Sequence, residues 1–227
     1  MLSCDIHLTA VEIDSVLAKQ LPETVCSYLS NKSEQLTVLN QSILKITALD
    51  LIKLPTIMIS SLPYNIAVPV ILHILENFPS IHTIVVIVQS EIAERLIAKP
   101  GEKKFGIPSV KLSFYSNKIC LYDVISPTVF WPVPKVHSRP IRIERYRNFL
   151  WPTDCSFRNE VFQLINISFS QRRKTSHNAF TKWTGSKSKS LQLLKAANID
   201  PLCRSEALGI EDFIKVIKIK RHILENK

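Results

Sequence analysis

Glycine is scarce in this sequence. Only 4 of the 227 residues are glycine, and the first of them is Gly101. Residues 1–100 therefore cannot contain a glycine-rich loop, the element that lets a backbone approach a bound nucleotide closely. Apolar runs are short as well, and none reaches the roughly 18 uninterrupted residues that a membrane span requires. Because the N-terminus also has neither the basic start nor the apolar segment of a signal peptide, we expect a cytoplasmic protein.

The 5 cysteines give no sign of a metal site or a disulfide framework. They are far apart in the chain, and no two of them form a Cys-x-x-Cys pair. Free thiols are the simpler interpretation, and we expect no bound metal. With 46% hydrophobic and 21% charged residues, the composition is that of a globular protein with one good core and room for a small second domain.

Positive charge is concentrated in the last part of the chain. The net charge is +10; residues 1–138 contain 11 Lys/Arg and 11 Asp/Glu, whereas residues 139–227 contain 18 and 8. Scattered cations usually form a solvated surface, but an excess confined to one segment is typical of a phosphate-binding module. The distribution favours nucleic acid as the partner, with an anionic membrane surface as the weaker alternative.

A short motif, Ser60-Ser61-Leu62-Pro63-Tyr64-Asn65, lies between two apolar stretches, 56–59 and 66–78. Since the only proline of the second stretch falls in what would be the first helical turn, where proline is tolerated, the pattern predicts a strand, a tight turn and a helix. Main-chain carbonyls beside Pro63 can accept hydrogen bonds from an exocyclic amine, and Tyr64 can stack on a base. The same strand–turn–helix pattern is also common in α/β folds at positions that bind no ligand.

Further elements follow from apolar periodicity. We expect strands at 7–13, 35–40, 83–89 and 139–146, helices from Asp14 towards Tyr28 and over 90–98, and helices from Phe157 onward and over 211–225. The proline-rich stretch 130–135 predicts a stiff loop, and the serine- and lysine-rich stretch 186–190 a flexible one. Gln89 and Glu91 fall at the carboxyl edge of the sheet, where they either face a substrate or begin a helix.

Several of these stretches match one family in order and spacing. They are Leu62–Ala67, Val88–Leu96, Phe105-Gly106 with Ser109-Val110, Phe130–Val136 and Gln171–Thr175. On these motifs the sequence resembles the rRNA adenine dimethyltransferase family, which uses S-adenosylmethionine (SAM) to dimethylate adenines in small-subunit rRNA. The resemblance implies an α/β fold, with a Rossmann-like SAM-dependent methyltransferase core in residues 1–148 and a small all-helical domain in residues 149–227.

The resemblance also implies a first strand and a glycine-rich loop that the sequence lacks. In the family these precede the strand that ends in an acid, which here matches Leu8–Asp14. Either the sequence starts at an internal methionine, or the first strand, loop and helix have been lost. The second alternative would leave an open sheet edge and an incomplete SAM pocket.

By the same resemblance, Glu12 binds the SAM ribose, as an acid at the end of a nucleotide-binding strand does. Ser42 falls where the family has an acid that binds the adenine amine of SAM, and Ser61 falls where it has an asparagine. Both serines can still accept a hydrogen bond, but neither brings a charge. We expect Glu12, Ser42 and Ser61 to contact the cofactor.

Catalysis is expected at Ser61, Leu62, Pro63, Tyr64 and Phe130. The resemblance implies that Tyr64 and Phe130 sandwich the target adenine while Ser61 and the Pro63 region accept hydrogen bonds from its amine.

RNA binding is expected at Arg172, Arg173 and Lys174, because consecutive cations on a helix offer several phosphate contacts. The implied activity is dimethylation of two adjacent adenosines in the 3′-terminal hairpin of small-subunit rRNA, by a monomer that does not bind membranes. One alternative is a catalytically impaired assembly factor that binds the pre-ribosomal small subunit. A DNA adenine methyltransferase is the other, and the match at 171–175 argues against it.

Overall fold

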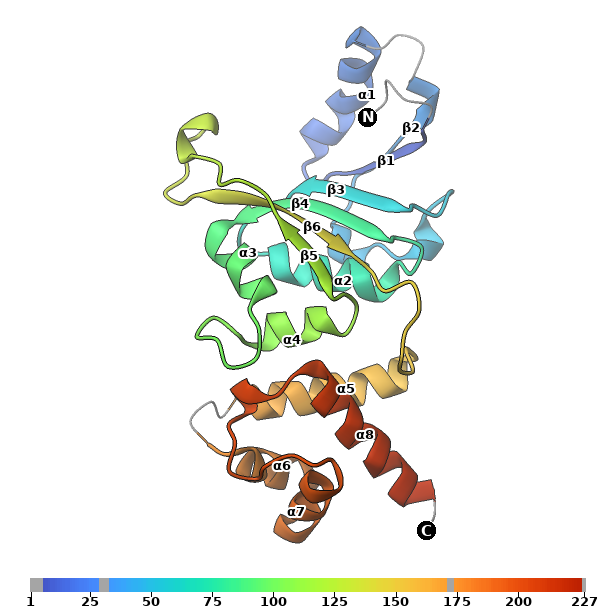
Figure 1. The fold of residues 1–227 in the computed structure, drawn as a ribbon. Coiled ribbons are helices and arrows are strands. Elements are labelled where there is room, and N and C mark those ends of the chain that lie inside the picture. The colour runs from blue at the N-terminus through green and yellow to red at the C-terminus, as the bar shows by residue number, and fades with distance from the viewer. Residues whose placement is uncertain (1–5, 29–32, 171–173, 226–227) are drawn as a thin grey trace. The chain divides into compact units, whose positions relative to one another are not determined.

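The computed structural model describes residues 6–28, 33–170 and 174–225. The chain forms two compact units, Met1–Ile84 and Val85–Lys227, which are described separately (Figure 1). The boundary expected between residues 148 and 149 falls inside the second unit and stays a prediction.

The first unit begins with a parallel strand pair joined by a helix. Strand β1 (Leu8–Val11) pairs with β2 (Leu36–Leu39) in the register Leu8↔Leu36 to Val11↔Leu39, and α1 (Ser15–Tyr28) makes the crossover. Parallel strands need such a crossover, and their carboxyl ends meet at one edge of the sheet. The short helical turns η1 (Ser33–Gln35), η2 (Ile43–Lys45) and η3 (Ala48–Asp50) flank and follow β2.

Helix α1 begins where the sequence supplies a cap. The Asp14 carboxylate accepts hydrogen bonds from the backbone N–H groups of Val16 at 2.8 Å and Leu17 at 3.1 Å. Aspartate is a preferred residue at this position, because it satisfies N–H groups that have no partner inside the helix. The helix buries little of its apolar surface, and Ala18 is its buried residue.

The predicted strand, turn and helix around residues 60–65 are confirmed. Strand β3 (Ile57–Ser61) leads through the turn into α2 (Ala67–Asn77), and Pro69 lies in the first turn of that helix. Helix α2 buries one apolar face, consisting of Ala67, Val70, Ile71, Ile74 and Leu75.

The chain divides within β4 (Thr83–Gln89), whose sheet has the strand order β3-β4-β6-β5. In the second unit, β5 (Lys118–Leu121) runs antiparallel to β6 (Ser138–Glu144), with Lys118 opposite Glu144 and Leu121 opposite Ile141. Helix α3 (Ser90–Ile97) follows β4 directly, and α4 (Ile107–Ser113) packs against it. The predictions for 83–89, 90–98 and 139–146 are confirmed to within two residues.

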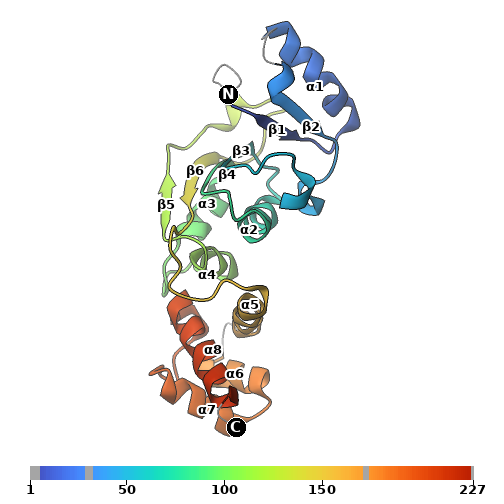
Figure 2. The ribbon, with the colours of Figure 1, turned by 90° about the vertical axis from the view of Figure 1, so that its right-hand side faces the viewer.

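Four longer helices complete the second unit: α5 (Cys155–Phe169), α6 (Ser176–Thr184), α7 (Lys187–Ala196) and α8 (Ile210–Glu225). Between α7 and α8 lies the short turn η5 (Ser205–Ala207). Helix α4 contacts both α5 and α8, and α6 packs against α7, as both ribbon views show (Figures 1 and 2). In the part of the chain that the structure describes, no helix is long and apolar enough to cross a membrane.

The prediction of a flexible loop at 186–190 is wrong. Ser186 is the N-cap of α7, and its hydroxyl accepts a hydrogen bond from the Lys189 N–H at 3.4 Å. The alternating serines and lysines suggest a loop although they begin a helix, because serine is as typical of a helix N-cap as of a loop. Burial of Leu193 and Leu194 then fixes the helix against its neighbours.

An ionic cluster ties α5 to α8. Glu160 accepts hydrogen bonds from Lys220 Nζ at 2.7 Å and from Arg221 Nη2 at 2.7 Å, and Arg221 Nη2 also donates to the Ser156 hydroxyl at 2.9 Å. Desolvation raises the pKa of Glu160, but the hydrogen bonds from Lys220 and Arg221 outweigh it and leave this pKa below its ordinary value. The carboxylate therefore stays ionised and holds the two helices together.

Candidate functional site

The expected cofactor residues lie where the parallel strands of the first unit end. Glu12 follows β1, and its N–H donates to Leu39 O at 3.0 Å, which extends the ladder by one step. The Asn40 side chain then donates from Nδ2 to the carbonyls of Glu12 at 2.9 Å and Ile13 at 3.2 Å. These bonds fix the two strand ends to each other, so Glu12 and the 40–42 turn share one edge.

One of the two carboxylate oxygens of Glu12 already accepts a hydrogen bond. Its Oε1 accepts the backbone N–H of Asp14 at 2.9 Å, while the residues that the structure describes give Oε2 no partner. The side chain is half-buried. A carboxylate held at one oxygen and open at the other is suited to accept a ribose hydroxyl.

Ser42 is the second acceptor at this edge. It is half-buried and precedes η2, but its hydroxyl makes no capping hydrogen bond. Over the described ranges this hydroxyl has no other partner, so it can donate to or accept from a ligand.

Together, Glu12 and Ser42 fit the ribose and adenine of SAM. The rest of a nucleotide site is not supplied in the same way, since all four glycines, Gly101, Gly106, Gly185 and Gly209, belong to the second unit. In the described residues of the first unit, the contacts available to the cofactor are therefore acceptor side chains rather than a glycine loop.

The turn after β3 presents its polar groups and buries its apolar one. Ser61 and Pro63 are exposed, Tyr64 is half-buried, and Leu62 is 6% exposed. The turn closes through a hydrogen bond from Ile66 N–H to the Pro63 carbonyl at 3.1 Å. Buried Leu62 anchors the turn, while its neighbours face outward.

The main-chain carbonyls of this turn differ in availability. The Pro63 carbonyl already accepts one hydrogen bond, whereas the Leu62 carbonyl accepts none from the described residues. A carbonyl without a partner is the stronger candidate to accept an amine proton. The sequence pointed to the region of Pro63 and could not distinguish the two groups.

Phe130 belongs to the second unit, so the sandwich that it would form with Tyr64 stays a prediction. It lies half-buried in a loop, residues 126–137, whose base is closed by an antiparallel bridge. In that bridge, Ile125 N–H donates to Ser138 O at 2.8 Å and Ser138 N–H donates to Ile125 O at 3.2 Å. The loop predicted at 130–135 is confirmed, since these residues form neither helix nor strand; the short helical turn η4 (Pro127–Val129) precedes it, and the stiffness of the loop stays a prediction.

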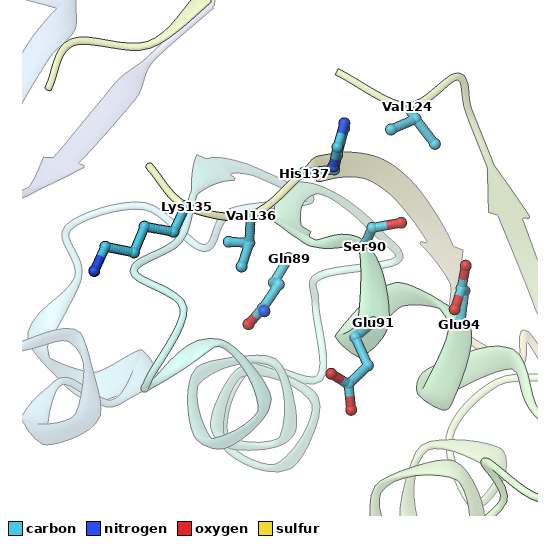
Figure 3. Close-up of a pocket in the computed structure, with 8 residues that line it drawn as sticks. All are labelled: Gln89, Ser90, Glu91, Glu94, Val124, Lys135, Val136 and His137. Carbon is cyan, nitrogen blue, oxygen red and sulfur yellow. The ribbon is translucent and has the colours of Figure 1, made fainter. Parts of the chain in front are cut away.

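A pocket of about 410 Å³ lies beside this loop (Figure 3). It is formed by the end of β4, the first two turns of α3, Val124 before the loop and the last three residues of the loop itself. Its lining residues are Gln89, Ser90, Glu91, Glu94, Val124, Lys135, Val136 and His137. The sequence left open whether Gln89 and Glu91 face a substrate or begin a helix. Gln89 is the N-cap of α3 and Glu91 lies in its first turn, and both also line this pocket.

Of the expected RNA-binding residues, Lys174 is exposed in the bend before α6, whereas Arg172 and Arg173 lie outside the described residues. The helices that follow carry further exposed lysines, which the sequence interpretation missed. They are Lys182 on α6, Lys187, Lys189 and Lys195 on α7, and Lys215 and Lys218 on α8. Lysines are well suited to phosphate contacts because they act as mobile point charges.

The parallel strand pair β1–β2 with its helical crossover, followed by the strand, turn and helix of residues 57–77, is typical of a Rossmann-like methyltransferase fold. Solved structures support this class. A dimethyladenosine transferase from Plasmodium falciparum is similar with a TM-score of 0.76 at 20% identity, covering 94% of this chain and 82% of that one. The 23S rRNA methyltransferase ErmE is similar with a TM-score of 0.62 at 19% identity, covering 92% and 80%.

The family follows from the sequence comparisons. Residues 3–222 match the family described as ribosomal RNA adenine dimethylase. "Ribosomal RNA small subunit methyltransferase A" of Mycobacterium leprae (strain Br4923) is 50% identical over 218 residues, which are 96% of this chain and 71% of that protein. The protein of the same name from Mycobacterium sp. (strain KMS) is 51% identical over 212 residues, 93% and 72%. The chain belongs to the ribosomal RNA adenine dimethylase family, a family of SAM-dependent methyltransferases.

Proposed function

We propose that this protein dimethylates the exocyclic N6 amines of two adjacent adenosines in the 3′-terminal hairpin of small-subunit rRNA. The observation that carries the proposal is the identity of about 50% to ribosomal RNA small subunit methyltransferase A over nearly the whole chain. The turn Ser61–Tyr64 supports it, because it offers hydrogen-bond acceptors and an aromatic ring side by side at the end of a strand.

Methyl transfer to an adenine requires that the enzyme orient the exocyclic amine. The lone pair of adenine's amine is delocalised into the ring, so the amine is a poor nucleophile. Acceptors at its two protons turn the lone pair toward the methyl donor; this turn supplies the Ser61 hydroxyl and the Leu62 carbonyl, which accepts no hydrogen bond from the described residues. Orientation of this kind can contribute up to ~7–11 kcal/mol in well-aligned cases.

The aromatic residues hold the base. An adenine must leave the helical stack to reach the enzyme, and aromatic rings replace the stacking that it loses. Tyr64 covers one face of the base and Phe130 covers the other. The first methylation leaves a larger amine, so the second requires the Ser61–Tyr64 turn to accommodate one methyl group.

The cofactor residues are Glu12, Ser42 and Ser61. When bound, SAM supplies an electrophilic methyl group on a sulfonium sulfur. The open Oε2 of Glu12 holds the ribose, and the Ser42 hydroxyl contacts the adenine amine of the cofactor.

The basic helices bind the rRNA. Arg172, Arg173 and Lys174, with the exposed lysines of α6, α7 and α8, neutralise phosphates on the small subunit. The protein acts in the cytoplasm, as a monomer, on the ribosomal subunit during its assembly.

Methyl transfer to small subunits that lack this modification tests the proposal. With labelled SAM, mass spectrometry of nuclease-digested rRNA should find N6,N6-dimethyladenosine at two adjacent positions near the 3′ end. Monomethyladenosine alone would contradict dimethylation, and modification elsewhere would contradict the assigned site. A Leu49→Ala variant is a matched control, because this side chain is 96% exposed and is assigned no role.

A second candidate is an assembly factor that binds the small subunit without modifying it. It is supported by Ser42 and Ser61, which replace the charged and amide residues expected at these positions. Tight binding to unmethylated subunits without any methyl transfer would favour this candidate over the enzyme.

A further inference from the structure

The loop of residues 126–137 presents apolar side chains outward. Trp131 is 93% exposed, and its neighbours Val129 and Val133 are 67% and 55% exposed. An indole ring held almost entirely in solvent contributes nothing to the core. It is available to stack on a partner.

This exposure belongs to a loop that is fixed at several points. Besides the bridge between Ile125 and Ser138, Phe130 N–H donates to Pro127 O at 3.1 Å, and Ser90 N–H donates to His137 O at 2.9 Å. Because these hydrogen bonds hold the loop at both ends and at its helical turn, the loop loses little conformational entropy when it binds a partner. Trp131 is therefore held on a preorganised loop.

The pocket next to the loop has both satisfied and unsatisfied polar groups. Its two carboxylates are already paired, Glu91 with Arg95 at 2.8 Å and Glu94 with Lys104. The side chains of Gln89 and Lys135 have no hydrogen-bond or ion-pair partner among the residues that the structure describes. Figure 3 shows Gln89 next to Val136, and Lys135 on the adjoining part of the loop with its side chain extended.

The unsatisfied groups have the chemistry of a nucleotide subsite. A carboxamide both donates and accepts, so Gln89 can pair with the edge of a base. An ammonium group suits a phosphate. Because Arg95 and Lys104 neutralise the two carboxylates, an incoming phosphate near Lys135 meets no unpaired negative charge from Glu91 or Glu94.

We propose that Trp131, Lys135 and Gln89 form a subsite for an unpaired nucleotide of the RNA substrate, next to the adenosine that is methylated. Trp131 stacks on its base, Lys135 contacts its phosphate and Gln89 hydrogen-bonds to the base edge. The inference rests on the proposed function, since it assumes an RNA substrate. Unpaired RNA is the expected ligand because its bases are free to stack, whereas those of a duplex are not.

Binding of synthetic RNA tests the subsite without requiring catalysis. Fluorescence anisotropy compares an unpaired oligonucleotide with a fully paired duplex of the same length. Trp131→Ala should weaken binding of the unpaired RNA about ten-fold, Trp131→Phe about two-fold, and the duplex affinity should not change. Val129→Ala, in the same loop and also exposed, is the matched control and should bind like the unaltered protein.

Two further readouts separate stacking from general attraction. Unpaired RNA should quench the fluorescence of Trp131, and Trp131→Phe should remove that quenching although Trp151 and Trp183 remain. Lys135→Ala should reduce the slope of log affinity against log salt by about 0.7. Gln89→Ala should leave that slope unchanged while it alters the preference among bases.

The outcomes distinguish the subsite from the function on which it rests. If Trp131→Ala and Val129→Ala bind unpaired RNA equally well, the subsite is wrong while the methyltransferase proposal stands. Equal losses on unpaired and duplex RNA would also overturn the subsite, because stacking requires a free base. If the unaltered protein binds neither RNA nor the small subunit, the proposed function fails first.

Discussion

Residues 6–61 and the rest of the described chain are built in different ways. Between Ile6 and Ser61, the buried apolar side chains of the described residues are Ala18 and Ile46. The second unit instead buries Phe114, Phe157, Phe180 and Phe213, each at most 1% exposed. The two regions carry the two halves of the proposed reaction, since the residues proposed to bind the cofactor lie in the first and those proposed to bind RNA lie in the second.

The comparison shows that a site can be positioned without a large core. Glu12 and the 40–42 turn are held by main-chain pairing and by the Asn40 side chain, with little side-chain packing beneath them. Nearby apolar side chains remain exposed, among them Ile13, Val16, Ile57 and Ile59. Regions with few buried apolar contacts open at low free energy, so we expect the cofactor side to be the less stable one.

The largest effect is expected at the turn after β3. Tyr64→Ala should lower kcat for methyl transfer roughly a hundred-fold, because an unclamped base loses its alignment with the methyl donor. Tyr64→Phe keeps the ring and should retain most of the activity. Affinity for SAM should be unaffected in both variants, and a Tyr64→Ala enzyme with unaltered kcat would contradict the assignment.

The next effect is expected at the strand ends. Glu12→Gln should weaken SAM binding about ten-fold or more, because a hydrogen bond to a charged acceptor is replaced by a neutral one. Calorimetry measures the affinity for SAM, and anisotropy should show unchanged RNA binding. Glu34→Gln, exposed and in the same unit, is the matched control. Equal SAM affinity for the two variants would remove Glu12 from the cofactor site.

A third effect concerns the second unit. Glu160→Gln should lower the free energy of unfolding by about 1–2 kcal/mol, because Lys220 and Arg221 lose a charged acceptor. Since the folded pKa of Glu160 is lowered, its contribution is present above the ordinary glutamate pKa and is lost as pH falls through the lowered value. Urea unfolding at several pH values should show the variant and the unaltered protein converging at acid pH. A difference that persists there would contradict an ionic origin.

The smallest effect compares the lysines of the two regions. Lys187→Ala with Lys189→Ala should weaken RNA binding several-fold and reduce the salt slope by about 1 per lysine. Lys45→Ala with Lys53→Ala removes the same charge from exposed positions of the first unit and should change neither quantity. Equal effects of the two pairs, measured by anisotropy between 50 and about 200 mM salt, would show that net charge alone drives binding.

Sequence patterns predicted the elements that depend on local signals. The β-branched run 84–88 located β4, and Pro69 with the apolar stretch after it located α2. Helix α4 and strand β5 were missed because they depend on distant contacts. The helix has seven residues, fixed by burial of Val110 and Leu112, and β5 is a four-residue strand defined by its pairing with β6.

The candidate site was predictable in its residue types but not in its detail. The resemblance supplied Glu12, Ser42 and the 61–64 turn, and the structure places Glu12 and Ser42 at the ends of adjacent strands. No pattern in the sequence could show that the Leu62 carbonyl has no partner among the described residues while the Pro63 carbonyl has one, because hydrogen bonding in a turn depends on its dihedral angles. Exposure of Trp131 was equally hidden, since an aromatic in a proline-rich loop packs inward or outward with the same local sequence.

Calorimetric titration of this chain with SAM tests the central claim most directly. We predict binding in the micromolar range, weakened about ten-fold or more by Glu12→Gln and unchanged by Tyr64→Ala. Absence of binding by the folded chain would contradict the enzyme and leave the small-subunit assembly factor as the function.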